Sequence, residues 1–176
     1  MTVATHAPFP VPRGLAVAFA ATGPLAIGGM LAVRAHDAGP VLAAPAIVFG
    51  VVAATAPALY IASAAVGAAP SLATVARAFA TAFGAFGIAL AGLILPAVFI
   101  AVSSVSPRTT IAAASVALGG AGVLGLRRLA DELEAGARGR TPGATLAAGA
   151  VFAVWAVATG AIAGRLWWEL AVEVAS

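Results

Sequence analysis

Long apolar runs without charge, bounded by arginine, polar residues or proline, constrain this chain more than any other feature. A membrane-spanning helix needs roughly 20 mostly apolar residues, because each adds about 1.5 Å across a hydrocarbon core near 30 Å thick. Five segments meet or approach that length: residues 14–33, 41–66, 78–102, 109–126 and 144–164. The sequence therefore predicts an all-α fold, a polytopic integral membrane helical bundle with about five transmembrane helices.

Composition supports a membrane environment and limits the chemistry. The 176 residues are 62% hydrophobic and 9% charged, whereas soluble domains average about 25% charged residues. There is no cysteine, which excludes disulfides and thiolate metal ligands. Every basic side chain that gives the net charge of +3 is arginine, and most flank apolar runs. This pattern indicates membrane topology and lipid contact rather than nucleic-acid binding, and the arginine and alanine bias is typical of a GC-rich genome.

The polar parts of the chain lie at its start and before the last span. Residues 1–13 contain three prolines and are expected to be a disordered cytoplasmic segment. Residues 127–143 are expected to be a cytoplasmic polar segment, in which the fourth helix continues to about Gly136. Thr141 as N-cap and Pro142 at the first helical position then begin the last helix. The residues after Arg165 are expected to lie along the membrane surface, with Trp167 and Trp168 as an interfacial belt.

Proline and glycine modify the spans. Kinks are expected at three prolines inside apolar runs: Pro24, Pro57 and Pro96. The span 109–126 is the shortest, and its glycines suit close helix contact in lipid more than they break the helix. The residues that we expect at helix-packing faces are Ala80, Gly84, Gly87, Ala91, Gly119 and Gly122.

Arginine distribution predicts the orientation. With five crossings, the N-terminal side holds Arg13, Arg77, Arg127, Arg128, Arg138 and Arg140, and the other side holds Arg34, Arg108 and Arg165. The positive-inside rule then places the N-terminus in the cytoplasm and the C-terminus outside, in the cytoplasmic membrane of a bacterium. The alternative is that residues 1–35 are a cleaved signal peptide, which would leave four spans and an external mature N-terminus.

Two apolar features allow a functional as well as a structural interpretation. Phe79, Phe83 and Phe86 form a stripe on the third span, which suits packing or lipid contact, or alternatively a groove for lipid or quinone. Tyr60 and Ser63 follow Pro57, where a loosened turn beside polar groups can form a binding site, although an interfacial tyrosine is the simpler interpretation.

Ionisable residues are absent from all five span interiors. Such groups usually mark ion paths and proton relays, so a proton-coupled transporter, a pump or a voltage sensor is disfavoured. Neither His6 nor His36 has a second ligand at metal spacing, and the acidic residues near Asp131 resemble a solvated helix face. We therefore expect no enzyme activity, no catalytic or metal site and no cofactor.

Two stretches resemble a known family. The first is Tyr60 through Arg77, with Gly67, Ser71 and Thr74, and the second is Gly125-Leu126-Arg127-Arg128 before the last span. About half of the chain thus resembles prokaryotic Yip1-like membrane proteins, which implies five spans, a cytoplasmic N-terminus and a non-enzymatic role in trafficking or membrane organisation. The aspartate and the Tyr-Gly-Pro sequence typical of eukaryotic members are absent, and Thr22-Gly23-Pro24 does not replace them.

The sequence thus predicts a non-enzymatic integral membrane protein that acts as a subunit or organiser of a membrane complex. It would contact a protein partner, or itself, through the glycine-rich helix faces. Its expected cytoplasmic contact surface is Arg127, Arg128, Arg138 and Arg140, which also suits anionic lipid headgroups. The alternative function is a carrier or channel for a small neutral or apolar solute.

Overall fold

The computed structural model describes residues 13–104, 106–136 and 141–175, which form helices and short connections with no strand among them. The expected disorder of residues 1–12 lies outside the described residues, whereas Arg13 begins the first helix. The elements in chain order are α1 (Arg13–Ala35), α2 (Gly39–Pro45), the π-helical turn η1 (Ala46–Gly50), α3 (Val51–Ala65), α4 (Leu72–Ser103), α5 (Pro107–Ala135) and α6 (Pro142–Ala175).

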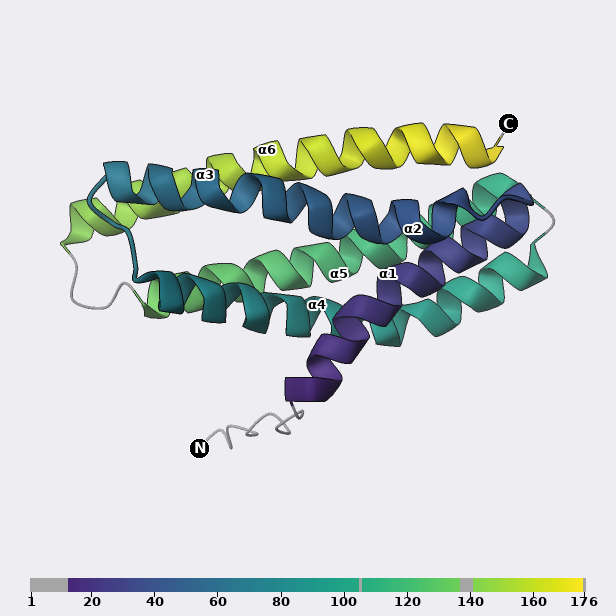
Figure 1. Ribbon diagram of the computed structural model, residues 1–176, viewed down its shortest axis with the longest axis horizontal. Helices are drawn as coiled ribbons and strands as arrows, with labels where there is room; N and C mark the ends of the chain where they lie inside the picture. The colour runs from purple at the N-terminus through teal and green to yellow at the C-terminus, as the bar shows by residue number, and fades with distance from the viewer. Residues whose placement is uncertain (1–12, 105, 137–140, 176) are drawn as a thin grey trace, which may run out of the picture.

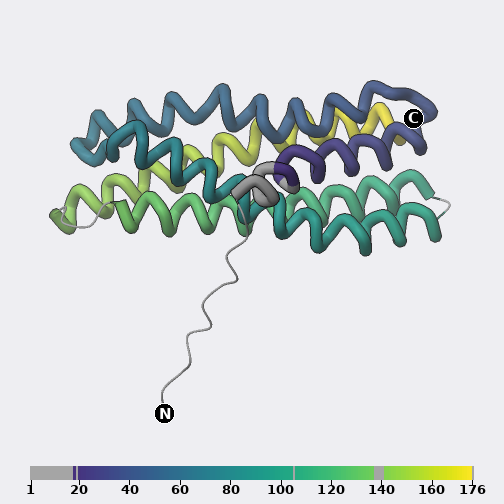
Figure 2. Tube along the Cα trace, turned by 60° about the horizontal axis from the view of Figure 1, so that its bottom comes forward, coloured from purple at the N-terminus to yellow at the C-terminus, as the bar shows by residue number. Residues whose placement is uncertain are grey.

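The helices form two layers (Figures 1 and 2). In one layer α3 lies along α6, and in the other α4 lies antiparallel to α5, the most extensive contact of the fold. Helix α1 crosses obliquely against α4 and begins part-way along the bundle. We call the end where α4 begins and α5 ends the Arg77 end, and the opposite end, where α1 and α6 end, the Arg34 end.

Four helical segments are long and apolar enough to cross a membrane: Gly39–Ala65, Leu72–Ser103, Pro107–Ala135 and Pro142–Ala175. Helix α1 has a shorter apolar stretch, Ala20–Ala35. The predicted all-α polytopic bundle of a multi-pass membrane protein is confirmed, and a fifth crossing by α1 remains a prediction.

Helix ends follow local signals. The Ser71 hydroxyl accepts from the Thr74 backbone N–H at 3.2 Å and caps α4, and Thr141 Oγ1 accepts from the Ala144 N–H at 3.4 Å to cap α6. Gly67, with φ of +68°, ends α3 in a Schellman motif, because the Ala68 N–H reaches the Ser63 carbonyl at 2.8 Å. The expected continuation of the fourth span to about Gly136 is also observed.

The prolines act differently from one another. Pro24, Pro57 and Pro96 lie within continuous helices, and kinks at these positions remain predictions. The helical hydrogen-bond pattern changes instead directly after Pro45, in η1. Proline has no N–H to donate and its ring crowds the carbonyl four residues earlier, here that of Val41, and a wider π-helical turn relieves such crowding.

The end of the chain differs from the expectation. No separate surface segment follows Gly164 within the described residues, because α6 continues without a break to Ala175. Leu170 and Val174 are buried against the core that contains Ile27 and Leu31 of α1. The burial of these two side chains against α1 explains why α6 continues past Gly164 along the bundle. The expected tryptophan belt is split, since Trp167 is half-buried in the bundle whereas Trp168 is 66% exposed.

Candidate functional site: an apolar cavity between the two helix layers

A partly open cavity of about 380 Å³ lies between the two layers, within the range of about 300–1,000 Å³ typical of small-molecule pockets. It is bounded by η1 and the start of α3, by the first half of α4, and by the facing sides of α5 and α6. Its lining residues are Ile47, Val48, Val52, Phe79, Ala82, Phe83, Phe86, Ser115, Leu118, Gly119, Gly122, Val123, Gly125, Leu126, Leu129, Trp155, Ala156, Thr159, Gly160, Ala163, Gly164 and Trp167.

Aromatic side chains form the α4 wall. Phe79, Phe83 and Phe86, the stripe found in the sequence, all line the cavity. The Phe83 ring lies 5.4 Å from that of Phe49, and the Phe79 ring meets Trp155 edge-on at 6.0 Å, centroid to centroid. These ring contacts connect α4 to η1 and α6, and so close this side of the cavity.

Glycines form the opposite side. A Cβ atom built on Gly119, Gly122, Gly160 or Gly164 would meet no atom within 4 Å. Except for Gly122, which is half-buried, these glycines are exposed although they line the cavity. The cavity therefore opens between α5 and α6, where the missing side chains leave space.

The expected helix-packing residues lie in several environments. Gly84 and Gly87 are buried in α4, Ala80 is exposed and Ala91 is half-buried. Gly119 and Gly122 line the cavity and make no close contact with another described helix. Close packing of α5 on α4 occurs one turn further on, at Gly125, where a Cβ would lie 3.1 Å from Phe86 Cβ.

Three hydrogen bonds fix α6 beside the cavity. Trp155 Nε1 donates to the Thr55 carbonyl oxygen at 2.9 Å, and Thr159 Oγ1 donates to Thr55 Oγ1 at 3.1 Å. Toward the Arg34 end, Trp167 Nε1 donates to Ser115 Oγ at 2.8 Å. The sequence alone did not predict these contacts, although isolated hydroxyl residues within apolar spans could have indicated polar contacts between helices.

Among the residues that the structure describes, none that lines the cavity is ionisable. Its polar side-chain groups are the two indole N–H groups of Trp155 and Trp167 and the two hydroxyls of Ser115 and Thr159, and each takes part in one of the bonds just described. Among the described residues no group of three or more His, Asp or Glu is placed to hold a metal ion. The site can therefore surround an apolar molecule but presents no pair of groups for acid–base chemistry.

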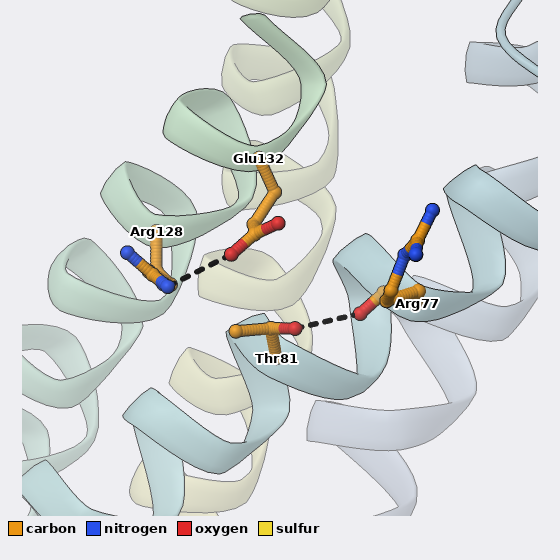
Figure 3. Close-up of polar contacts among 4 residues, drawn as sticks. All are labelled: Arg77, Thr81, Arg128 and Glu132. Atoms are coloured by element: carbon orange, nitrogen blue, oxygen red, sulfur yellow. Dashed lines mark hydrogen bonds and ion pairs between the residues drawn. The ribbon is translucent and has the colours of Figure 1, made fainter. Parts of the chain in front are cut away.

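Arg128, one of the arginines of the expected contact surface, lies on α5 near the start of α4, which holds Arg77 (Figure 3). Arg128 pairs with Glu132 on its own helix at 2.8 Å, and the Thr81 hydroxyl donates to the Arg77 carbonyl at 2.8 Å. Arg127 is exposed. Arg138 and Arg140 lie outside the described residues.

The other candidate residues are not part of the cavity lining. Tyr60 is half-buried and Ser63 is buried near the end of α3. At the Arg34 end, the Arg34 guanidinium donates to the carbonyls of Ala101 and Ser104. These carbonyls lie at the C-terminal end of α4, where the last carbonyls of a helix need partners from outside it, so Arg34 caps α4 from α1. The sequence did not indicate this contact.

Comparisons with protein-family models, with curated proteins and with solved structures find no match to this chain.

Proposed function

We propose that this protein binds a lipid-like apolar molecule in the cavity between its helix layers, as a non-enzymatic membrane carrier or lipid-binding protein. The cavity itself carries the proposal. It is lined almost wholly by apolar side chains and opens between α5 and α6 toward the surface that faces lipid in a multi-pass protein. Such a site favours hydrocarbon over a solute that needs hydrogen bonds.

The shape of the cavity favours a chain-like ligand. Its lining runs along α5 from Ser115 to Leu129, a length of about 21 Å at 1.5 Å per residue. An acyl or isoprenoid chain fits a long, narrow apolar space that is open sideways to the bilayer. The Phe79–Phe86 stripe would contact the chain on one side, and the glycines of α5 and α6 would admit it on the other.

A subunit or organiser of a membrane complex is the second candidate, and a difference in burial favours it. In the most apolar 18-residue stretch of α6, and in that of Gly39–Ala65, 11% of the residues are buried, against 28% in α4 and in α5. The α3–α6 layer thus leaves most of its apolar surface for lipid or a protein partner. The Yip1-like resemblance and the arginines at the Arg77 end belong to this candidate.

For orientation we propose five crossings, including α1, with the N-terminus cytoplasmic and the C-terminus outside. Arg77 lies in the first two turns of α4, and Arg127 and Arg128 lie in the last third of α5. All three are therefore toward the Arg77 end of the bundle, on the side to which the sequence assigns six of nine arginines. The positive-inside rule supports placing this end in the cytoplasm of a bacterial cell.

The test is purification in native nanodiscs followed by mass spectrometry of everything that is retained. One enriched lipid or isoprenoid at a fixed ratio to the protein, beyond its share of the bulk membrane, supports cavity binding. A stoichiometric protein without an enriched apolar molecule supports the subunit candidate and rejects the carrier.

A further inference from the structure

We infer that the outer face of α6 is a contact surface through which two copies of this chain associate in the membrane. This face, the α6 seam, consists of Val154, Ala158, Ala161, Arg165, Trp168 and Val172. Their spacing alternates between four and three residues, which keeps them on one side of a helix as in a coiled coil. All six are exposed, and they lie across α6 from the cavity residues Ala163 and Trp167.

The depth of Arg165 is the first observation. On α5 the apolar stretch 109–126 is about 27 Å long, close to the roughly 30 Å of a bilayer core. Ser115 lies about a third of the way along that stretch and bonds to Trp167. Trp155 belongs to the same buried cluster as Leu129, which lies beyond the other end of the α5 stretch. Arg165 lies two residues from Trp167 toward Trp155, which places it near the middle of the α5 stretch.

Arg165 was expected at the end of a span, because the apolar run 144–164 ends there. The apolar runs of α5 and α6 are instead offset along the bundle. As a result, the ion pair between Arg165 Nε and Glu169 Oε1, at 2.8 Å, lies at the depth of apolar α5, with its side chains 75% and 55% exposed. Ionisable groups within spans almost always face protein or a water-filled cavity rather than lipid. The exposure of this pair therefore indicates a surface that another protein covers.

Charge complementarity indicates that the protein covering the α6 seam is a second copy of this chain. Arg165 and Glu169 are one helical turn apart and opposite in sign, so the seam is complementary to itself. The two residues lie about 40° apart around α6, so with a two-fold axis along the membrane normal that passes between them, Arg165 of each copy lies beside Glu169 of the other. Ala158 and Ala161 leave room for two helix backbones to approach closely. The seam faces away from the cavity, so this inference does not depend on the proposed ligand.

Cysteine cross-linking tests the inference directly, because the chain has no cysteine of its own. Ala161→Cys lies on the seam, and the matched control Val116→Cys on α5 is 71% exposed at a depth close to that of Arg165. Mild oxidation in native membranes should yield a disulfide-linked homodimer for Ala161→Cys and none for Val116→Cys. Equal dimer yields at both positions, no dimer at Ala161, or a cross-link only to a different protein would each overturn the inference.

A charge swap in the Ala161→Cys background separates pairing from misfolding. Arg165→Glu alone and Glu169→Arg alone place like charges across the interface. Each should lower the dimer fraction about tenfold, which corresponds to about 1.4 kcal/mol. Co-expression of the two single variants restores opposite charges across the interface but not within either helix, and should recover a dimer that contains one copy of each variant. Yields are scored against membrane-inserted protein, and no recovery on co-expression or no loss in the single variants contradicts the pairing.

Discussion

Trp155 and Thr55 join α6 to α3 by a hydrogen bond of 2.9 Å from the indole Nε1 to a backbone carbonyl oxygen. Twelve residues further along α6, Trp167 makes the corresponding bond to Ser115 of α5 at 2.8 Å. The two indoles thus hold α6 at both ends of the apolar cavity and against different layers of the bundle.

Replacing Trp155 with Phe should destabilise the bundle. The change removes the bond to Thr55 and leaves ring contact with Phe79 largely in place, so we expect a loss of about 0.5–2 kcal/mol in the free energy of unfolding. Unfolding by sodium dodecyl sulfate in mild detergent, followed by circular dichroism, measures it. The matched control is Trp168→Phe, because this indole is 66% exposed and makes no hydrogen bond that the structure identifies. Equal losses of unfolding free energy in both variants would show that the Trp155 hydrogen bond does not stabilise the bundle.

Filling the cavity should remove its ligand. A Leu at Gly122 would project into the cavity, because no atom lies within 4 Å of a Cβ built there. We expect Gly122→Leu to lose most of the apolar molecule that copurifies with the wild-type protein, and to unfold at the wild-type detergent concentration or above it.

The control for this experiment is Gly92→Leu on α4. Gly92 is also a helical glycine with open space around it, but it is exposed and does not line the cavity. Gly92→Leu should retain the ligand at the wild-type ratio. Retention by both variants would place the bound molecule outside the cavity.

Local signals in the sequence predicted much of the fold. The pair Thr141-Pro142 begins α6, and Gly136 follows the last residue of α5, as expected. These features depend on the conformation and bonding of a few neighbouring residues. The same holds for the apolar run 78–102, which lies within α4 because its length and composition suffice to predict a helix.

The site could not be predicted in the same way, because a spacing pattern defines a helix face without identifying what lies against it. The glycine cluster of α5 indicated close packing, yet Gly125 packs on Phe86 whereas Gly119 and Gly122 border the cavity. A rotation of about 100° per residue separates these environments. Trp167 was likewise assigned to the interface from its neighbours, whereas the pairing of α6 with α5 turns it inward to Ser115.

Two adjacent glycines of α1 should respond in opposite ways to alanine. A Cβ on Gly28 would lie 2.4 Å from the Pro40 carbonyl oxygen, whereas Gly29 has no atom within 4 Å of its Cβ position. Because backbone cannot move aside cheaply, Gly28→Ala should cost about 1–3 kcal/mol of unfolding free energy. Gly29→Ala should be neutral or stabilising by up to about 1 kcal/mol. The same detergent titration compares them, and equal stability would show that α1 does not pack on α2 this closely.

Reversing the arginines of the contact surface should change the topology. Arg127, Arg128, Arg138 and Arg140 contribute most of the positive charge on the proposed cytoplasmic side, so replacing all four with Glu should invert the bundle or give mixed orientations. Orientation can be measured with single cysteines at Gly143 and Asp37, which are exposed and lie at the start of α6 and just after α1, near opposite ends of the bundle. A membrane-impermeant thiol reagent added to intact cells labels only the cysteine that faces the outside. In the wild-type background, Gly143→Cys should be protected from the reagent and Asp37→Cys should be labelled. Replacing the four arginines with Glu should exchange these labelling results or make labelling equal at the two positions. Replacing the same four arginines with Lys keeps the charge and should keep the wild-type pattern. An unchanged pattern in the Glu variant would contradict the orientation argument.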